Sequence, residues 1–222
     1  DQQGNVIGTI DGLRAWHETH PGAVYIHGGR TFQIERIDEA TRTIYAAPAK
    51  TSYYTRVRSE KETLILEVRD QKRLSGCPMY FGRLRVTEQI TGYERRCTRT
   101  GRLLGVTALD APPFVFDTEG LWVSIDEELQ QKTEEALIHF MGSIHALEHA
   151  GIGILPLLVM CDRNDLGGIS TPMHMQVGRP AVFIYDGMPG GAGLARAAFA
   201  KGQELMDNIY KTIAGCACEI GC

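Results

Sequence analysis

The stretch Ala181–Cys222, AVFIYDGMPGGAGLARAAFAKGQELMDNIYKTIAGCACEIGC, contains the signals that decide the fold of this chain. It begins with five apolar residues, 181–185, a run that is typical of a buried strand. A glycine-rich loop follows, and apolar residues at helical spacing from Leu194 to Ile213 predict a helix. Gly215 is placed to terminate that helix.

The glycine loop after the strand has two possible roles. A strand, a glycine loop and a helix together can bind phosphate at the helix N-terminus, but glycines also permit close packing. Gly190-Gly191-Ala192-Gly193 does not match G-x-G-x-x-G, and no G-x-x-x-x-G-K-[ST] occurs in the chain. We therefore expect no Walker-type ATP site here, and we favour packing over phosphate binding.

The chain finishes with three closely spaced cysteines, Cys216, Cys218 and Cys222, in the pattern C-x-C-x3-C. Thiolates are soft, charged ligands, and a structural zinc ion usually takes four ligands. The run therefore predicts a structural zinc (Zn²⁺) site with three ligands from one loop. The fourth is either Cys161 or a residue beyond Cys222, and the alternative to zinc is a set of buried thiols or disulfides.

Composition places the chain among ordinary globular proteins. It has 222 residues, 43% hydrophobic and 23% charged, which suits one large domain or two small ones. The formal net charge of −4 gives no overall attraction to nucleic acid or to an anionic membrane, so any such binding needs a local patch. Six cysteines at this length favour a reducing compartment, and we expect a cytoplasmic location. Without a signal peptide or an apolar run of about 18 residues, we expect no membrane partner.

The order of the predicted elements favours an α+β protein with three consecutive parts. These are a small β-rich subdomain at 1–60, a β-hairpin-rich region at 61–125, and an α/β domain at 126–222 that ends in the cysteine knuckle. Short strands and tight turns in the first part predict a small β-barrel or a curled antiparallel sheet. The predicted strands are 23–27, 31–37, 43–45, 63–68 and 114–125, with a long hairpin over 80–107.

Arginines gather near the end of the predicted hairpin, and we interpret them as candidate nucleic-acid-binding residues. Arginine suits phosphate because its guanidinium is always charged and offers several donors. Arg56 and Arg58 follow two tyrosines, and aromatic rings next to arginines can stack on bases. The alternative is an edge strand with solvated arginines. The full candidate set is Arg95, Arg96, Arg99, Arg102, Arg56 and Arg58.

A long helix is predicted after Ser124, which with Glu127 has the spacing of a capping box. Its apolar stripe runs from Leu129 to Leu147. The apolar run Ile154–Met160 then predicts a buried strand, and the acidic segment 161–168 predicts a turn.

The helix carries His145-Ala146-Leu147-Glu148-His149, which matches H-x-x-E-H. Two histidines at i and i+4 share a helix face and can bind one zinc ion, with the glutamate as general base. A zinc hydrolase is therefore an alternative function. The simpler interpretation is a pair of helix histidines that border the core.

Several motifs together resemble one family. They are HALEHA at 145–150, C-x3-D-x-G-G from Cys161, Y-D-x3-G-G-x-G-L from Tyr185, and the cysteine knuckle, with H-P-G-A-x-Y at 20–25, Y-Y-T at 53–55, V-T-E-Q at 86–89 and G-Y at 92–93 upstream. This set, which covers nearly the whole chain, is similar to the zinc-binding C-terminal region of the MrfA-type DEAD/DEAH-box helicases.

The resemblance implies a superfamily-two motor that unwinds DNA with 3′-to-5′ polarity and acts in DNA repair, with related domains in phage-defence proteins. The motor domains would precede Asp1, and the family's knuckle would supply a fourth cysteine three residues past Cys222 rather than Cys161. Because the chain begins without Met and ends inside the cluster, we expect a fragment of a larger helicase. We expect it to catalyse nothing alone, to assist DNA binding and to brace the motor; a purely structural or protein-interaction module is a further alternative.

Overall fold

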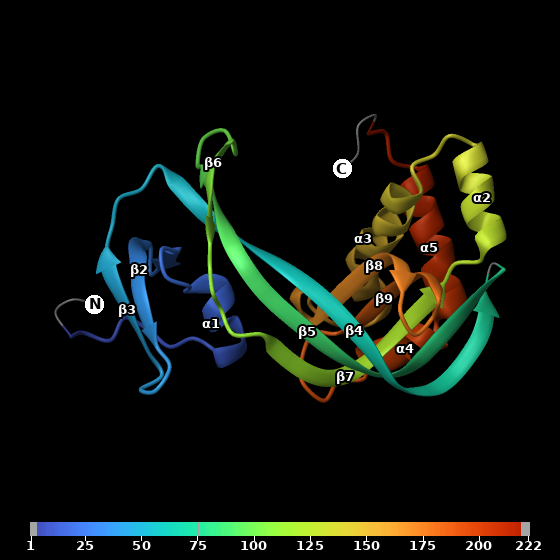
Figure 1. Ribbon diagram of the computed structural model, residues 1–222, viewed down its shortest axis with the longest axis horizontal. Coiled ribbons are helices and arrows are strands. Elements are labelled where there is room, and N and C mark those ends of the chain that lie inside the picture. The colour runs from blue at the N-terminus through green and yellow to red at the C-terminus, as the bar shows by residue number, and fades with distance from the viewer. Residues whose placement is uncertain (1–3, 75, 219–222) are drawn as a thin grey trace. The chain divides into compact units, whose positions relative to one another are not determined.

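The computed structural model describes residues 4–74 and 76–218 and confirms an α+β fold made mostly of strands (Figure 1). The chain forms two compact units, which are described separately. Unit 1 comprises residues 1–61 and 88–114, and unit 2 comprises residues 62–87 and 115–222. Neither unit is continuous in sequence, because the long strands β4 (Tyr53–Leu74) and β5 (Cys77–Cys97) contribute residues to both. The division into three consecutive parts stays a prediction.

Unit 1 contains a three-stranded antiparallel sheet in the order β1-β2-β3. The short helix α1 (Gly12–Glu18), which the sequence did not predict, precedes β1 (Val24–His27), β2 (Arg30–Asp38) and β3 (Thr43–Pro48). Between β1 and β2, Gly28 and Gly29 have φ values of 55° and 73°, which side chains with a Cβ rarely adopt. The glycine turn and the three strands predicted here are therefore confirmed.

The sheet of unit 2 is built from the remaining parts of β4 and β5 together with β7 (Phe114–Ser124), β8 (Leu166–His174) and β9 (Arg179–Asp186). Its strand order is β4-β5-β7-β9-β8, and β6 (Leu103–Ala108) pairs with the end of β5 that belongs to unit 1. Strand β9 is central and antiparallel to both neighbours.

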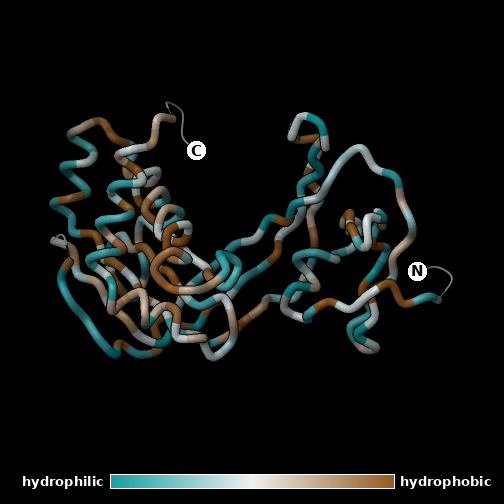
Figure 2. Tube along the Cα trace, turned by 180° about the vertical axis from the view of Figure 1, so that it is seen from behind, coloured by the Kyte–Doolittle hydropathy of each residue, from teal (hydrophilic) through white to brown (hydrophobic). Residues whose placement is uncertain are grey.

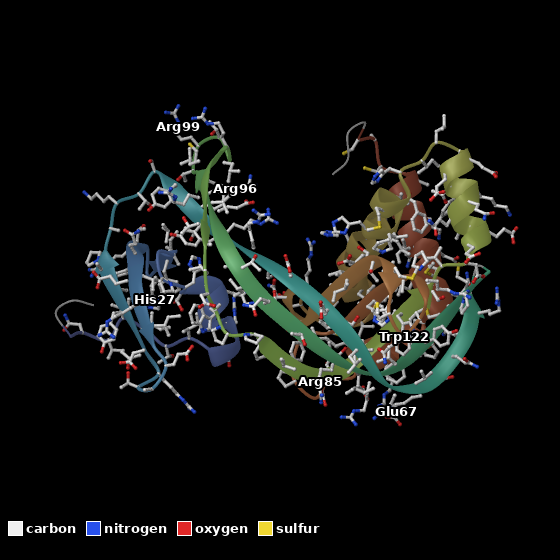
Figure 3. The ribbon with its side chains drawn as sticks, viewed as in Figure 1. His27, Glu67, Arg85, Arg96, Arg99 and Trp122 are labelled. Carbon is white, nitrogen blue, oxygen red and sulfur yellow. The ribbon has the colours of Figure 1, made fainter. Side chains whose placement is uncertain are left out.

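Strand β9 is buried on both faces of this sheet. Val182 and Ile184 of β9 belong to the core cluster that includes Ile144, Leu155 and Leu205 from the helices. The alternate residues of β9, Ala181, Phe183 and Tyr185, pack with Trp122 in a second cluster on the other face, and Figure 3 labels Trp122 inside unit 2. Burial on both sides explains why β9 is a continuous apolar run, and the predicted buried strand is confirmed.

The side chain of Gln176 joins the two edge strands of this sheet. Its amide nitrogen donates to the backbone carbonyl of Ile65 at 2.9 Å, and its carbonyl oxygen accepts from the backbone N–H of Ile65 at 2.6 Å. These bonds imitate a strand partner, so the edge of β4 is covered next to the β8–β9 turn. By contrast, the last residues of β4 are mostly hydrophilic (Figure 2).

Five helical segments complete unit 2: α2 (Glu127–Glu135), α3 (Phe140–Leu158), the 3-10 turn η1 (Arg163–Asp165), α4 (Leu194–Ala200) and α5 (Gly202–Ala214). Helix α3 packs against β8, β9 and α5. The turn predicted at 161–168 is confirmed up to Asp165, where the carboxylates of Asp162 and Asp165 accept backbone N–H bonds around η1, whereas residues 166–168 already belong to β8. None of the helices in the described residues has the length and apolarity that a bilayer span requires.

The predicted single helix after Ser124 is wrong. Ser124 is the last residue of β7 and is buried, and Asp126 is the N-cap of α2. The chain leaves the helical path at Leu137, whose φ is 57°, and a second helix begins after His139. The apolar residues at 129–147 keep a helical spacing in the sequence across this break. The pattern therefore did not reveal that the backbone leaves the helix at Leu137.

The predicted strand Ile154–Met160 is also wrong, because α3 continues to Leu158 and includes Pro156. A short apolar run is compatible with either a buried strand or a buried helix, so periodicity alone does not distinguish them. The side chains at the end of the run, Leu157 and Met160, are exposed. The helix predicted from Leu194 is confirmed, divided at Lys201 into α4 and α5, and Gly215 caps α5 as expected.

Candidate nucleic-acid interface and metal-ligating groups

The β5–β6 hairpin carries the predicted arginines, which with two arginines of β4 we call the hairpin arginine group: Arg56, Arg58, Arg95, Arg96, Arg99 and Arg102. The turn between the two strands is held by backbone bonds from Gly101 to Cys97 at 2.8 Å and from Cys97 to Arg102 at 2.9 Å. Figure 3 shows Arg96 and Arg99 at this end of the hairpin. All six residues belong to unit 1, and their role as nucleic-acid-binding residues stays a prediction.

One part of the group surrounds a carboxylate. Arg96 donates to Glu94 at 2.7 Å and to the carbonyl of Gly101 at 3.1 Å, so it also holds the turn. The hydrogen bond from Arg96 lowers the pKa of Glu94 and outweighs the opposing effect of its partial burial, and the charges of Arg58 and Arg56 lower it further. These three arginines therefore share Glu94.

The other part of the group is less constrained. Arg95 is exposed and lies with its guanidinium 6.0 Å from the centre of the Tyr53 ring. Arg99 and Arg102 are exposed in and beside the turn. Because side chains alternate along a strand, Tyr53 projects from the side of β4 opposite to Arg56 and Arg58. The six arginines therefore surround the hairpin rather than forming a single row.

A second concentration of arginine lies in unit 2 and was not predicted. This sheet arginine group consists of Arg69, Arg83, Arg85 and Arg196. Figure 3 labels Arg85 on β5. The signal was present as the alternation of Arg83 with Arg85, which places both on one face of the strand.

Two carboxylates of β7 pair with all four of these arginines. Asp117 receives two bonds from Arg85, at 2.7 and 3.1 Å, and the hydrogen bond from Arg85 lowers the pKa of Asp117. Glu119 pairs with Arg69 at 2.6 Å and with Arg196 at 2.7 Å. These last two arginines also line a pocket of about 640 Å³ with Phe81 and Phe199.

The glycine loop after β9 is organised by the buried carboxylate of Asp186. Its two oxygens accept backbone N–H bonds from Ala192 at 2.6 Å, Leu194 at 3.2 Å and Ala195 at 2.7 Å. The first amides of α4 are therefore already bonded within the protein. This arrangement supports the packing interpretation, because a phosphate would have to displace Asp186.

The cysteine segment follows α5 directly. Cys216 is tied to the helix end by its backbone N–H, 3.3 Å from the carbonyl of Ile213. Cys216 and Cys218 are both exposed, and Cys222 lies outside the described residues. Two thiols held two residues apart at a helix end have the soft donor chemistry that zinc favours, so the segment fits this metal.

Cys161 does not share this environment. It packs against the core cluster between the helices and the sheet. Burial, and then the charge of Asp165, raises the pKa of the Cys161 thiol. Because zinc binds the thiolate, a thiol that resists deprotonation is a weaker candidate for the fourth ligand.

The H-x-x-E-H residues do come together on α3. Each of His145, Glu148 and His149 offers a donor atom, and the three atoms lie within 4.8 Å of one another. The imidazole centroids are 4.3 Å apart. Ser170 of β8 donates its hydroxyl to Glu148 at 2.6 Å and lies 3.1 Å from Nδ1 of His145.

Comparisons with known proteins agree on one family. Residues 147–222 match the model of MZB, the MrfA Zn-binding domain. The chain is 29% identical over 220 residues to the uncharacterized ATP-dependent helicase YprA of Bacillus subtilis, covering 98% of this chain and 29% of YprA. It is 32% identical over 82 residues to the uncharacterized protein MJ1572.1 of Methanocaldococcus jannaschii, covering 36% of this chain and 73% of that protein.

The fold agrees as well. The crystal structure of the DUF1998 helicase MrfA bound to DNA matches with a TM-score of 0.63 and 27% identity, over 95% of this chain and 28% of that chain. The chain thus spans less than a third of the length of the helicases it matches. The predicted resemblance is confirmed: residues 147–222 belong to the MrfA Zn-binding domain family, and the chain is homologous to ATP-dependent helicases.

Proposed function

We propose that this chain is the zinc-binding accessory module of an ATP-dependent DNA helicase, and that its β5–β6 hairpin helps to bind DNA. The observation that carries the proposal is the hairpin arginine group, in which Arg96 pairs with Glu94 while Arg95, Arg99 and Arg102 are exposed. A surplus of arginine on an exposed hairpin suits the phosphate backbone. The similarity to MrfA, whose structure contains DNA, supports the same role.

The zinc site belongs to this proposal. Cys216, Cys218 and Cys222 would hold a structural zinc ion next to the end of α5, with a fourth cysteine beyond them as the family pattern implies. A metal held by residues that follow a helix contributes its binding free energy to local folding. The ion would therefore stabilise the segment after Ala214 and take no part in chemistry.

Other features of the proposal rest on homology. They are the bracing of motor domains in the same polypeptide, a 3′-to-5′ polarity, a role in DNA repair and a cytoplasmic location.

The hydrolase alternative is less favoured by the geometry. A general base must reach the water that it activates, but Glu148 is only 7% exposed and its Oε2 already accepts a bond from Ser170. If Glu148→Gln leaves every activity of the full-length protein intact, this alternative is removed.

DNA binding by the full-length protein at several salt concentrations tests the main proposal. We expect Arg95→Ala/Arg99→Ala/Arg102→Ala to weaken binding and to lower the slope of log affinity against log salt by about 2–3, since each lost phosphate contact removes about 0.7–0.9. Arg30→Ala, an exposed arginine of β2, is the matched control. An unchanged affinity and slope would instead favour a purely structural or protein-interaction module.

Zinc content tests the metal site separately. We expect the full-length protein to lose one equivalent of structural zinc when Cys216 and Cys218 are both replaced by serine. Retention of that zinc would assign the ion to other ligands.

A further inference from the structure

We infer that α3 carries a second transition-metal site, formed by His145, Glu148 and His149 and separate from the cysteine segment. The three residues lie at i, i+3 and i+4, so they share one side of the helix. Their donor atoms all lie within 4.8 Å of one another. Ligands of a tetrahedral ion at zinc-like bond lengths are separated by about 3.3 Å, which small side-chain rotations reach from this arrangement.

Strand β8 holds the cluster in place. The Ser170 hydroxyl donates to Oε2 of Glu148 at 2.6 Å, and Nδ1 of His145 lies 3.3 Å from the same oxygen. A carboxylate or hydroxyl that engages one imidazole nitrogen orients the ring and leaves the other nitrogen for a metal. The positions of both Glu148 and His145 are thus set by contacts outside their own helix turn.

The neighbouring glycine of β8 makes room for the carboxylate. A Cβ placed on Gly168 would lie 2.7 Å from Cδ1 of Ile152 and 2.9 Å from Cγ of Glu148, which is closer than real Cβ contacts occur. A larger residue at 168 would therefore require Ile152 and Glu148 to shift. The close approach of the strand is part of how the cluster is built.

The charge of Glu148 has little compensation within the protein. Its side chain is 9% exposed, and within residues 4–74 and 76–218 its ion-pair partner is His145, which is charged only when protonated. A buried carboxylate without a permanent cation is costly. A divalent ion between the three groups would supply the missing positive charge.

The donor set indicates the class of ion. Two imidazoles and one carboxylate suit zinc, cobalt, nickel or copper, whereas magnesium and calcium prefer oxygen ligands alone. The His145 side chain is 61% exposed and His149 is exposed as well, so an ion can enter from solvent. This inference is independent of the proposed DNA binding.

Cobalt(II) titration of the full-length protein tests the site, because cobalt bound by thiolates has a strong near-ultraviolet charge-transfer band that cobalt bound by imidazole and carboxylate lacks. We expect the Cys216→Ser/Cys218→Ser variant to retain one equivalent of cobalt without this band. Adding His149→Ala to that variant is expected to abolish the remaining binding. Adding His27→Ala, an exposed histidine of β1, is the control and leaves it unchanged.

A second pair of variants tests whether Glu148 and Ser170 contribute to metal binding or whether two surface histidines bind the ion alone. In the same cysteine-variant background, we expect Ser170→Ala, which removes a partner that orients a ligand, to weaken cobalt binding by about 10-fold or more. Glu148→Gln, which removes the charge of a ligand, should weaken it at least as much. Circular dichroism and thermal melting show whether each variant is folded. The inference is overturned if His149→Ala retains the cobalt, or if folded Ser170→Ala and Glu148→Gln variants bind as tightly as their parent.

Discussion

The hairpin arginine group of unit 1 and the sheet arginine group of unit 2 use the same residue type in opposite ways. In the sheet group, four arginines share the two carboxylates of Asp117 and Glu119 at distances between 2.6 and 3.5 Å. In the hairpin group, Arg96 pairs with Glu94, and the charges of Arg56 and Arg58 also act on that carboxylate. Paired arginines stabilise contacts between their own elements, whereas Arg95, Arg99 and Arg102 are exposed and form no ion pair within the described residues, so they suit an external anion. Whether an arginine has a carboxylate partner therefore indicates its role better than its exposed fraction does.

The largest expected effect is on DNA binding by the hairpin group. Arg99→Glu/Arg102→Glu should weaken DNA binding by about 100-fold or more at moderate salt, because attraction to phosphate becomes repulsion. The melting temperature should change by no more than about 2 °C, since within the described residues these exposed side chains form no ion pair with a carboxylate. Fluorescence anisotropy with a labelled oligonucleotide and thermal melting measure the two quantities. A large fall in melting temperature with unchanged affinity would reverse the roles assigned to the two groups.

A buried carboxylate in unit 1 extends the comparison to stability. Burial alone would raise the pKa of Glu88, but the hydrogen bond from His17, the charge of Lys61 and the hydroxyl of Ser59 lower it from 4.5 to about 2. A lowered folded-state pKa stabilises the protein fully above the unfolded value of 4.5, and this contribution is lost as pH falls through about 2.

Glu88→Gln should therefore lower the free energy of unfolding by about 2–3 kcal/mol at pH 7, and the difference from wild type should vanish near pH 2. Denaturant unfolding between pH 2 and pH 7 measures it. Glu39→Gln, an exposed glutamate in a turn of unit 1, is the control. If the free energies of unfolding of wild type and variant differ by the same amount at pH 2 and pH 7, then packing, not the charge of Glu88, is responsible.

Substitutions in the sheet arginine group should lower the stability of the protein without changing its affinity for DNA. Arg85→Ala removes a two-bond ion pair that is partly exposed to solvent, so we expect a loss of about 0.5–1 kcal/mol. DNA affinity should stay within about twofold. Arg83 lies 3.5 Å from Asp117, so Arg83→Ala should lower the free energy of unfolding by less, and it serves as the matched comparison. A fall in DNA affinity as large as that of the hairpin variants would place both groups on one DNA path.

The smallest expected effect concerns Glu94, the carboxylate that offsets part of the positive charge of the hairpin arginine group. Glu94→Gln removes the carboxylate that Arg96, Arg56 and Arg58 share. We expect DNA affinity to rise about two- to fivefold at low salt and the gain to disappear at high salt, because screening weakens the released charges. Weaker binding at all salt concentrations would mean that Glu94 is needed to orient Arg96 in the turn.

Local patterns predicted those elements whose burial is uniform. Strand β9 is covered on both faces, so successive side chains at 181–185 are apolar, and the continuous apolar run predicted a buried strand correctly. The glycine turn at 28–29 requires positive φ values, which glycine adopts readily, so a local sequence signal predicted it. The arginines of the hairpin lie close together in sequence, so their proximity in space followed from the hairpin itself.

Patterns failed where distant residues decide the outcome. Strand β4 continues for 22 residues with a mostly exposed, charged sequence, because β5 pairs with it. The run Ile154–Met160 became helix because α3 packs against β8, β9 and α5. The sheet arginine group joins residues from β4, β5, β7 and α4, and no spacing in the sequence connects these elements.

The sequence by itself determined the mixed α+β class, the cysteine triplet, the arginine-rich hairpin and the family, because these depend on residues close together in the chain or on many short motifs at once. Only the tertiary structure decided which arginines have carboxylate partners, that Asp186 occupies the amides of the glycine loop, and that Ser170 and Gly168 frame Glu148. The arginine pairs and the packing around Glu148 depend on contacts between residues far apart in sequence, and the bonds to Asp186 depend on how the loop folds back over six to nine residues. Such contacts form only when β-strand pairing and helix packing bring the segments within a few ångströms of one another.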